Sequence, residues 1–228
     1  MNKEEFEKEL LKLGIVLTEK QKSQLEEFYN ILIEENKKIN LTRILEKEDV
    51  YLKHFYDSLT IVKEEEVYLK HFYDSLTLIK AVNLQDNLTL LDVGTGAGFP
   101  GIVLKIVFPN LKVVLIDSLQ KRVNYLNRTI ESLGLENIKA IHTRSEDYKE
   151  TFDLVVARAV ARLDKLINWC SHLIGKNQLF VAMKANVDDE LVGIDKTLTK
   201  NNCLVENIEK CNLPKENSNR ALVVIRKK

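Results

Sequence analysis

The fold of this chain is set by one stretch, Leu90-Leu91-Asp92-Val93-Gly94-Thr95-Gly96-Ala97-Gly98-Phe99-Pro100-Gly101. The apolar residues at its start predict a buried strand. The glycines at alternate positions, Gly94, Gly96 and Gly98, let the backbone turn sharply and lie close to a ligand. A helix that follows such a turn presents free backbone N–H groups at its N-terminus, where nucleotide-like ligands bind.

The loop alone fits two cofactors. Gly96 to Gly101 matches the dinucleotide pattern G-x-G-x-x-G, which is typical of NAD(P) sites. Asp92 to Gly98 matches the acidic-x-G-x-G-x-G loop of S-adenosylmethionine methyltransferases. A third interpretation is a turn with a purely structural role, so the loop by itself leaves the ligand open.

The next apolar run, Val113 to Ile116, ends at Asp117, which lies 19 residues after Gly98. An acidic residue at the end of this second strand lies where a ribose diol binds, and its carboxylate can accept hydrogen bonds from both hydroxyls. Both cofactors carry that ribose. The alternative role for Asp117 is to cap the helix predicted over 119–133.

Composition describes an ordinary globular chain of 228 residues, of which 45% are hydrophobic and 30% charged. The opening residues Met1 to Glu5 do not form a signal peptide, and no apolar run approaches 18 residues. We therefore expect a cytoplasmic protein that does not bind a membrane. The three cysteines, Cys170, Cys203 and Cys211, lack the spacing of metal ligands, so we expect reduced thiols and no metal site.

The net charge of zero hides an asymmetry between the two parts of the chain. Residues 1–80 carry 13 Lys and Arg against 17 Asp and Glu, whereas residues 81–228 carry 21 against 17. The basic excess lies on the part with the glycine loop. This distribution permits a nucleic-acid substrate but does not require one.

Hydrophobic spacing divides the chain into a helical N-terminal region, 1–83, and a Rossmann-like domain, 84–228. The second region alternates strands and helices, which predicts a mostly parallel sheet covered on both faces. The predicted strands are 88–93, 112–116, 138–142, 153–157, 178–183, 203–209 and 220–226, and the predicted helices are 99–107, 119–133, 162–173 and 187–199.

The last two strands distinguish the two cofactors, because residues 213–219 join them as an antiparallel hairpin. A dinucleotide dehydrogenase normally needs a second mononucleotide-binding half and a catalytic domain, for which few residues remain. A methyltransferase sheet ends in an antiparallel strand and needs no second domain. We therefore predict an α/β fold with the Rossmann-like sheet of S-adenosylmethionine-dependent methyltransferases, antiparallel C-terminal strands and a helical N-terminal extension.

Several blocks of the sequence resemble the RsmG family, also called GidB, over residues 20–228. These blocks are the glycine loop, Ile116 to Arg122, Arg144-Ser145-Glu146, Ala157 to Ala161, Val181 to Lys184, Asn40-Leu41-Thr42, and His71 to Leu76. One departure is Ser145, where the family usually has Ala. The resemblance implies methylation of N7 of guanine 527 (nucleotide numbering) in bacterial 16S ribosomal RNA, with that RNA or the small ribosomal subunit as partner.

Guanine N7 carries a lone pair and no proton, so the implied reaction needs no general base. We therefore assign no catalytic residue, and expect structural or surface roles for His54, His71, His142 and His172. The resemblance and the loop together give the expected cofactor-binding residues, with Arg158 also close to the incoming RNA. They are Gly94, Gly96, Gly98, Phe99, Asp117, Ser145, Glu146 and Arg158.

Alternatives remain for several of these residues. Glu146 as a plain surface carboxylate is one alternative, and an ion pair of Arg158 with Asp153 or Asp92 is another. A weaker prediction is an RNA-contacting rim formed by Lys121, Arg122, Arg162, Lys184 and Arg220. The rival functions are a small NAD(P)-binding oxidoreductase and a regulatory protein that binds S-adenosylmethionine or RNA without catalysis.

The N-terminal region contains a direct duplication. Val50 to Thr60 recurs unchanged as Val67 to Thr77, so the units are 50–66 and 67–83. Over 17 residues a continuous helix turns about 260° beyond whole turns, so it cannot bury both copies on one side. We expect the second copy to pack on the sheet through Leu69, Phe72, Tyr73, Leu76 and Ile79. The first copy then leaves an apolar stripe, Leu52, Phe55, Tyr56 and Leu59, that favours dimerisation or swapping of an otherwise monomeric chain.

Overall fold

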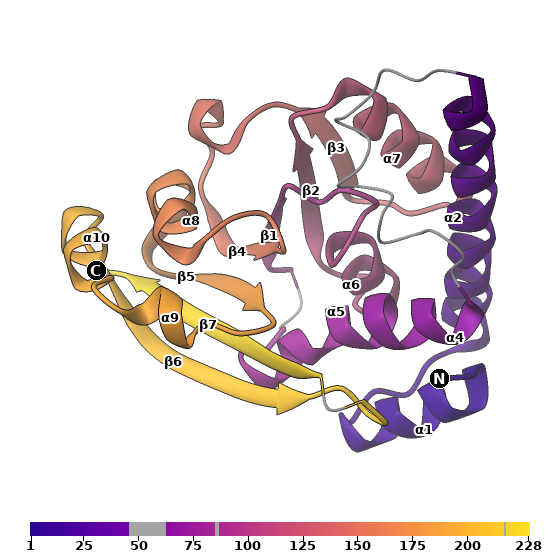
Figure 1. Ribbon diagram of the computed structural model, residues 1–228, viewed down its shortest axis with the longest axis horizontal. Coiled ribbons are helices and arrows are strands. Elements are labelled where there is room, and N and C mark those ends of the chain that lie inside the picture. Colours follow the sequence, from indigo (N-terminus) through magenta and orange to yellow (C-terminus); the bar gives the residue numbers. More distant parts are fainter. Residues whose placement is uncertain (46–62, 85–86, 217) are drawn as a thin grey trace.

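The structure is a computed structural model that describes residues 1–45, 63–84, 87–216 and 218–228, with side chains of 38–45 excepted. Its centre is a seven-stranded sheet with the order β3-β2-β1-β4-β5-β7-β6 (Figure 1). The strands are β1 (Thr89–Val93), β2 (Lys112–Asp117), β3 (Ile138–His142), β4 (Phe152–Arg158), β5 (Ile174–Lys184), β6 (Cys203–Asn212) and β7 (Asn219–Lys227).

The first five strands are parallel, and β7 runs antiparallel to both β5 and β6. The predicted fold class and the C-terminal hairpin are therefore confirmed. In β1, Leu90 to Val93 are all buried, as are Leu154 to Ala157 in β4. Such continuously buried runs, apolar apart from Asp92, arise because a parallel sheet is covered on both faces.

Helices cover the two faces of the sheet in separate layers (Figure 1). One layer contains α1 (Lys3–Lys12), α2 (Glu19–Leu45), α6 (Gly101–Val107) and α7 (Gln120–Ser132), with Phe6, Phe28 and Tyr125 in its core. The other contains α8 (Leu163–Cys170), α9 (Asp188–Leu191) and α10 (Asp195–Lys200), packed on the opposite side chains of the same strands. Sheet and helices therefore enclose two hydrophobic cores.

Glutamine side chains connect the N-terminal helices to the sheet's own helices. The Gln21 side-chain amide donates hydrogen bonds to the Ile106 and Val107 carbonyls at the end of α6, at 3.0 and 2.9 Å. Gln24 donates to the Leu133 carbonyl, just after α7, at 2.8 Å. These bonds satisfy carbonyls that a helix end leaves without a helical partner. The division of the chain into two domains at residue 83 stays a prediction.

Three boundaries differ from the predicted ones. The predicted helix 187–199 is two short helices, α9 and α10, because Gly193 between them has a φ of 74°. Residues 40–42, which interrupt the hydrophobic spacing, lie within α2 rather than ending it. The strand predicted over 178–183 begins earlier, at Ile174, and its pairing with β4 shifts register between Phe152 and Leu154.

The second repeat copy forms one continuous helical segment on the sheet. The helical segment begins at the end of the first unit with α4 (Glu64–Val67) and continues through the second copy as the π-helix η2 (Tyr68–Tyr73), α5 (Asp74–Leu76) and the 3-10 helix η3 (Thr77–Lys80). Phe72 is fully buried; its ring stacks on Phe28 at 5.7 Å between centroids and lies 6.1 Å from the Phe99 ring of the glycine loop. The second copy therefore packs on the sheet domain as predicted. The stripe Leu52 to Leu59 of the first copy lies outside the described residues, which take in only 63–66 of that copy.

Replacing Phe72 by Ala removes a fully buried ring from this contact and should lower the free energy of unfolding by about 3–5 kcal/mol. The repeat supplies a matched control, because Phe55→Ala makes the same change in an identical local sequence. Urea unfolding of both variants would measure the difference. We expect a much larger loss for Phe72→Ala, and equal losses would contradict the assignment of the second copy to this position.

Candidate active site

The glycine loop begins where β1 ends, and its backbone adopts conformations that suit glycine. Gly94, Gly96 and Gly98 have φ values of 66°, 60° and 99°. A Cβ atom at Gly94 would also meet Val160 Cγ2 at 2.8 Å, and one at Gly98 would meet Ile102 Cδ1 at 2.5 Å. Any larger residue at these two positions would have to displace a neighbouring side chain as well as strain the backbone.

A buried carboxylate holds the loop in this shape. Asp92 is fully buried, and its Oδ2 accepts hydrogen bonds from Thr95 Oγ1 at 2.6 Å and from the Gly101 amide at 2.8 Å. Gly101 lets the chain pass this close, since a Cβ there would lie 2.8 Å from the same oxygen. Among the described residues Oδ1 has no hydrogen-bond partner. Burial raises the pKa of Asp92 from 3.8 to about 6.

Asp117 connects the loop to the end of β2. Its Oδ2 accepts a hydrogen bond from the Gly96 amide at 3.1 Å, and its Oδ1 accepts one from the Leu119 amide at 3.0 Å. The helix-cap interpretation of Asp117 is wrong, because Leu119 occupies the cap position of α7 and no side chain caps that helix. Arg122 Nη1 lies 3.2 Å from Asp117 Oδ2, so this arginine forms an ion pair within the site and is not a solvated rim residue.

Ser145 and Glu146 lie in the 3-10 turn η4 (Ser145–Asp147), which follows β3. Ser145 is buried, Glu146 is exposed, and the Ser145 hydroxyl donates a hydrogen bond to Glu146 Oε2 at 2.8 Å. Since β1, β2 and β3 are neighbours and parallel, the glycine loop, Asp117 and this turn follow adjacent strand ends. The structure thus brings these predicted cofactor residues to one edge of the sheet, and their roles stay predictions.

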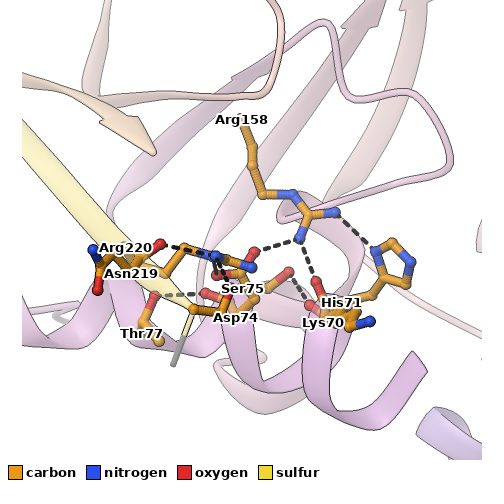
Figure 2. Close-up of polar contacts among 9 residues, drawn as sticks. Lys70, His71, Asp74, Ser75, Thr77, Arg158, Asn219 and Arg220 are labelled. Atoms are coloured by element: carbon orange, nitrogen blue, oxygen red, sulfur yellow. Dashed lines mark hydrogen bonds and ion pairs between the residues drawn. The ribbon is translucent and has the colours of Figure 1, made fainter. Parts of the chain in front are cut away.

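Arg158, at the end of β4, pairs with neither of the two acids named in the sequence interpretation. Its Nη1 donates hydrogen bonds to Asp74 Oδ2 at 3.0 Å and to the Lys70 carbonyl at 3.2 Å, and its Nη2 donates to His71 Nδ1 at 3.2 Å (Figure 2). Its guanidinium carbon also lies 5.1 Å from the centre of the Phe99 ring. The ion pair is therefore made across the fold, to the second repeat copy.

Two other rim candidates are also bound within the protein. Arg220 Nε donates a hydrogen bond to Asp74 Oδ1 at 2.7 Å, so one carboxylate serves two arginines (Figure 2). Lys184 donates to the Ala161 carbonyl at 2.7 Å and pairs with Glu190 at 2.9 Å. These side chains are mostly buried and paired within the protein, and their contact with RNA stays a prediction. Lys121 and Arg162 are exposed, as a rim requires.

A cleft of about 460 Å³ opens at the ends of β4 and β5, beside the loop residue Phe99. His71, which lines it, stacks on Phe99 with ring centres 4.8 Å apart. Burial, and then the charge of Arg158, lower the pKa of His71 to about 3, so the imidazole is neutral at physiological pH. The residues lining the cleft are Lys70, His71, Asp74, Arg158, Ala159, Met183, Lys184, Ala185, Asn186, Glu190, Arg220 and Leu222.

Sequence reasoning gave no site role to Lys70, His71 or Asp74, although His71 and Asp74 lie in a block that carried the family resemblance. Within the described ranges, no three His, Cys, Asp or Glu residues are grouped to hold a metal ion. No helix in that part of the chain is long and apolar enough to cross a membrane. The described functional groups of the site are a glycine loop, carboxylates, guanidinium and ammonium groups and a neutral imidazole.

This strand order, with a glycine loop after the first strand and an antiparallel seventh, defines the class of S-adenosylmethionine-dependent methyltransferases. A solved structure of this class, titled a SAM-dependent methyltransferase from Aquifex aeolicus, shares the fold with a TM-score of 0.54 and 18% identity. It covers 72% of this chain, and the match spans 93% of that protein. This likeness shows the fold, and the family membership described next gives S-adenosylmethionine as the cofactor.

The chain belongs to the family described as rRNA small subunit methyltransferase G (GidB), whose sequence pattern matches residues 21–66 and 61–222. Each of the two stretches contains one copy of the repeat. Ribosomal RNA small subunit methyltransferase G of Bacillus subtilis is 44% identical over 234 aligned residues, covering 100% of this chain and 91% of that protein. The protein of that name from Lactobacillus helveticus is 42% identical with the same coverage.

The raised pKa of Asp92 predicts a specific dependence of stability on pH. Between about pH 4 and pH 6 the unfolded chain has lost the proton from this carboxyl while the folded chain still holds it, so the free energy of unfolding falls as pH rises. Asp92→Asn removes this titration. The stability of the variant relative to the wild type should therefore increase from pH 4 to pH 7.

Urea unfolding of both proteins across this pH range would test the prediction. Other titrating groups, such as His71, contribute to both proteins and cancel in the difference. Two stability curves that stay parallel between pH 4 and pH 7 would show that burial does not raise the pKa of Asp92.

Proposed function

We propose that this chain transfers the methyl group of S-adenosylmethionine to N7 of guanine 527 in 16S ribosomal RNA. One observation carries the proposal beyond family membership. The glycine loop and the cleft adjoin through Phe99, which belongs to the loop and packs against His71 and Arg158 in the cleft wall. A methyl donor on the loop would therefore lie next to a base held in the cleft.

The proposed cofactor site follows the three adjacent strand ends. The proposed loop is the turn through Gly94, Gly96 and Gly98, where Val160 and Ile102 pack against the backbone at Gly94 and Gly98. Asp117 is the proposed ribose ligand, and Ser145 with Glu146 the proposed ligands of the adenine end. The two oxygens of the Asp117 carboxylate offer about four acceptor sites, and the Gly96 amide, the Leu119 amide and Arg122 Nη1, which reaches both oxygens, contact all of them. A ribose hydroxyl would therefore take the place of the longer Arg122 contact, at 3.5 Å.

When bound, S-adenosylmethionine supplies a methyl group attached to a positively charged sulfur. Guanine N7 has the lone pair that forms the new bond and has no proton to lose, so no side chain has to act as a base. The chain's own contribution is to align the base and to exclude water. A neutral His71 is consistent with a reaction that needs no general base, because its imidazole does not have to gain or lose a proton.

The proposed RNA contacts fall into two groups. Arg158 and Arg220 lie in the cleft wall, whereas Lys121 and Arg162 are exposed on the surface. Exposed cations bind phosphates through an electrostatic contribution to affinity, and this contribution falls as the salt concentration rises. Positioning of the target base is thus assigned to the cleft, and general affinity for RNA to the exposed cations.

Methyl incorporation from labelled cofactor into small ribosomal subunits that lack the modification tests the proposed reaction, with mapping of the product to guanine N7. Naked 16S RNA and mature subunits from a methylating strain serve as comparison substrates. Binding of the cofactor without incorporation would support a regulatory protein. Binding of NADH in place of the cofactor would support an oxidoreductase, and either result would refute the proposal.

Asp117→Ala should weaken the binding of S-adenosylmethionine by about 1–3 kcal/mol, because the ribose hydroxyls lose an acceptor and the Gly96 amide loses its partner. Calorimetry measures the change directly. Arg122→Ala is the matched control, since it removes the ion pair and keeps the carboxylate. Unchanged affinity in Asp117→Ala, or an equal loss in the control, would contradict the ribose role.

A further inference from the structure

We propose that Asp74 and His71 are positioning residues for methyl transfer: they fix the Arg158 guanidinium so that its unused edge binds a phosphate of the substrate RNA. The inference rests on the proposed function and adds two residues to it. Both belong to the second repeat copy, and both contact Arg158 directly (Figure 2).

The first step is an inventory of hydrogen-bond donors. A guanidinium has five N–H donors in a fixed plane. Nη1 of Arg158 donates its two N–H groups to Asp74 and to the Lys70 carbonyl, and Nη2 donates one of its two N–H groups to His71. Nε–H and the second Nη2 hydrogen have no partner among the residues that the structure describes. Nε and Nη2 form one side of the guanidinium plane, which is the geometry that binds a phosphate or carboxylate with two parallel hydrogen bonds.

The contact with His71 fixes the plane of this edge. An arginine only donates, so His71 Nδ1 must be unprotonated to accept from Nη2. The imidazole is itself held by stacking on Phe99, with 19° between the ring planes. Its pKa of about 3 keeps the imidazole neutral at physiological pH, and the contact with Nη2, which can only donate, selects the tautomer with Nδ1 unprotonated. Arg158 is therefore fixed at both terminal nitrogens by groups that are themselves buried or stacked.

The charges around Asp74 do not balance, and this favours an anion. Asp74 gives one oxygen to Arg158 and the other to Arg220, at 3.0 and 2.7 Å, so two guanidiniums share one carboxylate. The nearby Lys184 is neutralised by Glu190. Asp74, Arg158 and Arg220 together carry one excess positive charge, which the charge interaction of Arg158 with the buried Asp92 partly offsets. RNA brings one negative charge per phosphate. The carboxylate of the bound cofactor has the same chemistry, and the experiment below distinguishes these two anions.

The test compares steady-state kinetics of variants at the two side chains that contact Arg158; Asp74→Asn also changes the contact with Arg220, whereas the His71 variants below do not. Asp74→Asn should lower kcat at least tenfold, because the guanidinium is no longer fixed. KM for the RNA should stay the same or fall, because the variant carries one more positive charge. The dissociation constant of S-adenosylmethionine should stay within about twofold of the wild type. A residue that only stabilises the fold would lower the melting temperature and leave kcat unchanged, which would overturn the proposal.

Variants of His71 provide an independent arm if Asp74→Asn does not fold. His71→Phe keeps an aromatic ring on Phe99 but has no acceptor, whereas His71→Asn keeps a side-chain oxygen as acceptor. We expect at least a tenfold loss of kcat in His71→Phe and partial recovery in His71→Asn. Equal kcat in the two variants would show that the contact with Arg158 does not matter.

The duplication supplies matched controls, Asp57→Asn and His54→Phe, in an identical local sequence. They should change kcat by less than twofold; a large loss there, with none at residues 71 and 74, would overturn the assignment. Arg158→Lys keeps the charge and removes the two-donor edge, so KM for the RNA should rise severalfold. A loss of cofactor affinity with unchanged KM for RNA would instead assign the edge to the cofactor carboxylate. Absence of methyl transfer by the wild type would refute the proposed function itself.

Discussion

The site depends on the buried carboxylate of Asp92. Two donors separated along the chain, the Thr95 hydroxyl and the Gly101 amide, converge on one of its oxygens. This closes the glycine turn and determines where α6 begins. Phe99 lies within the closed turn, and the His71 ring and the Arg158 guanidinium both pack on its face. The geometry of the cleft is therefore linked to a hydrogen-bonded group that water does not reach.

The features of the fold that follow from local sequence could be predicted. Apolar runs marked the seven strands, and the hairpin of β6 and β7 followed from their spacing, because both signals arise within a few residues. Two features could not be predicted from hydrophobic spacing. The break at Gly193 depends on backbone conformation, and the continuation of α2 through residues 40–42 depends on packing. The π-helix η2 could not be predicted either, because over six residues its hydrophobic spacing cannot be told from that of an α-helix.

In the site, too, the features set by local sequence could be predicted, and those set by contacts between distant residues could not. The glycine loop and Asp117 are local signals, and the structure places them together. The partner of Arg158 was not predictable in this way, because Asp74 lies 84 positions earlier in the chain and reaches it only when a helix packs on the sheet. Asp153, which lies near Arg158 in sequence, instead binds the amide and hydroxyl of Thr89. Arg122 was assigned to a rim because its sequence position says nothing of its ion pair with Asp117.

The repeat copy on the sheet has few positions that can change without consequence. Phe72 and Leu76 fill the core, while Asp74 and His71 hold an arginine. The core contacts and the arginine contacts alternate along this segment. The eleven residues from Val67 to Thr77 are therefore expected to tolerate few substitutions.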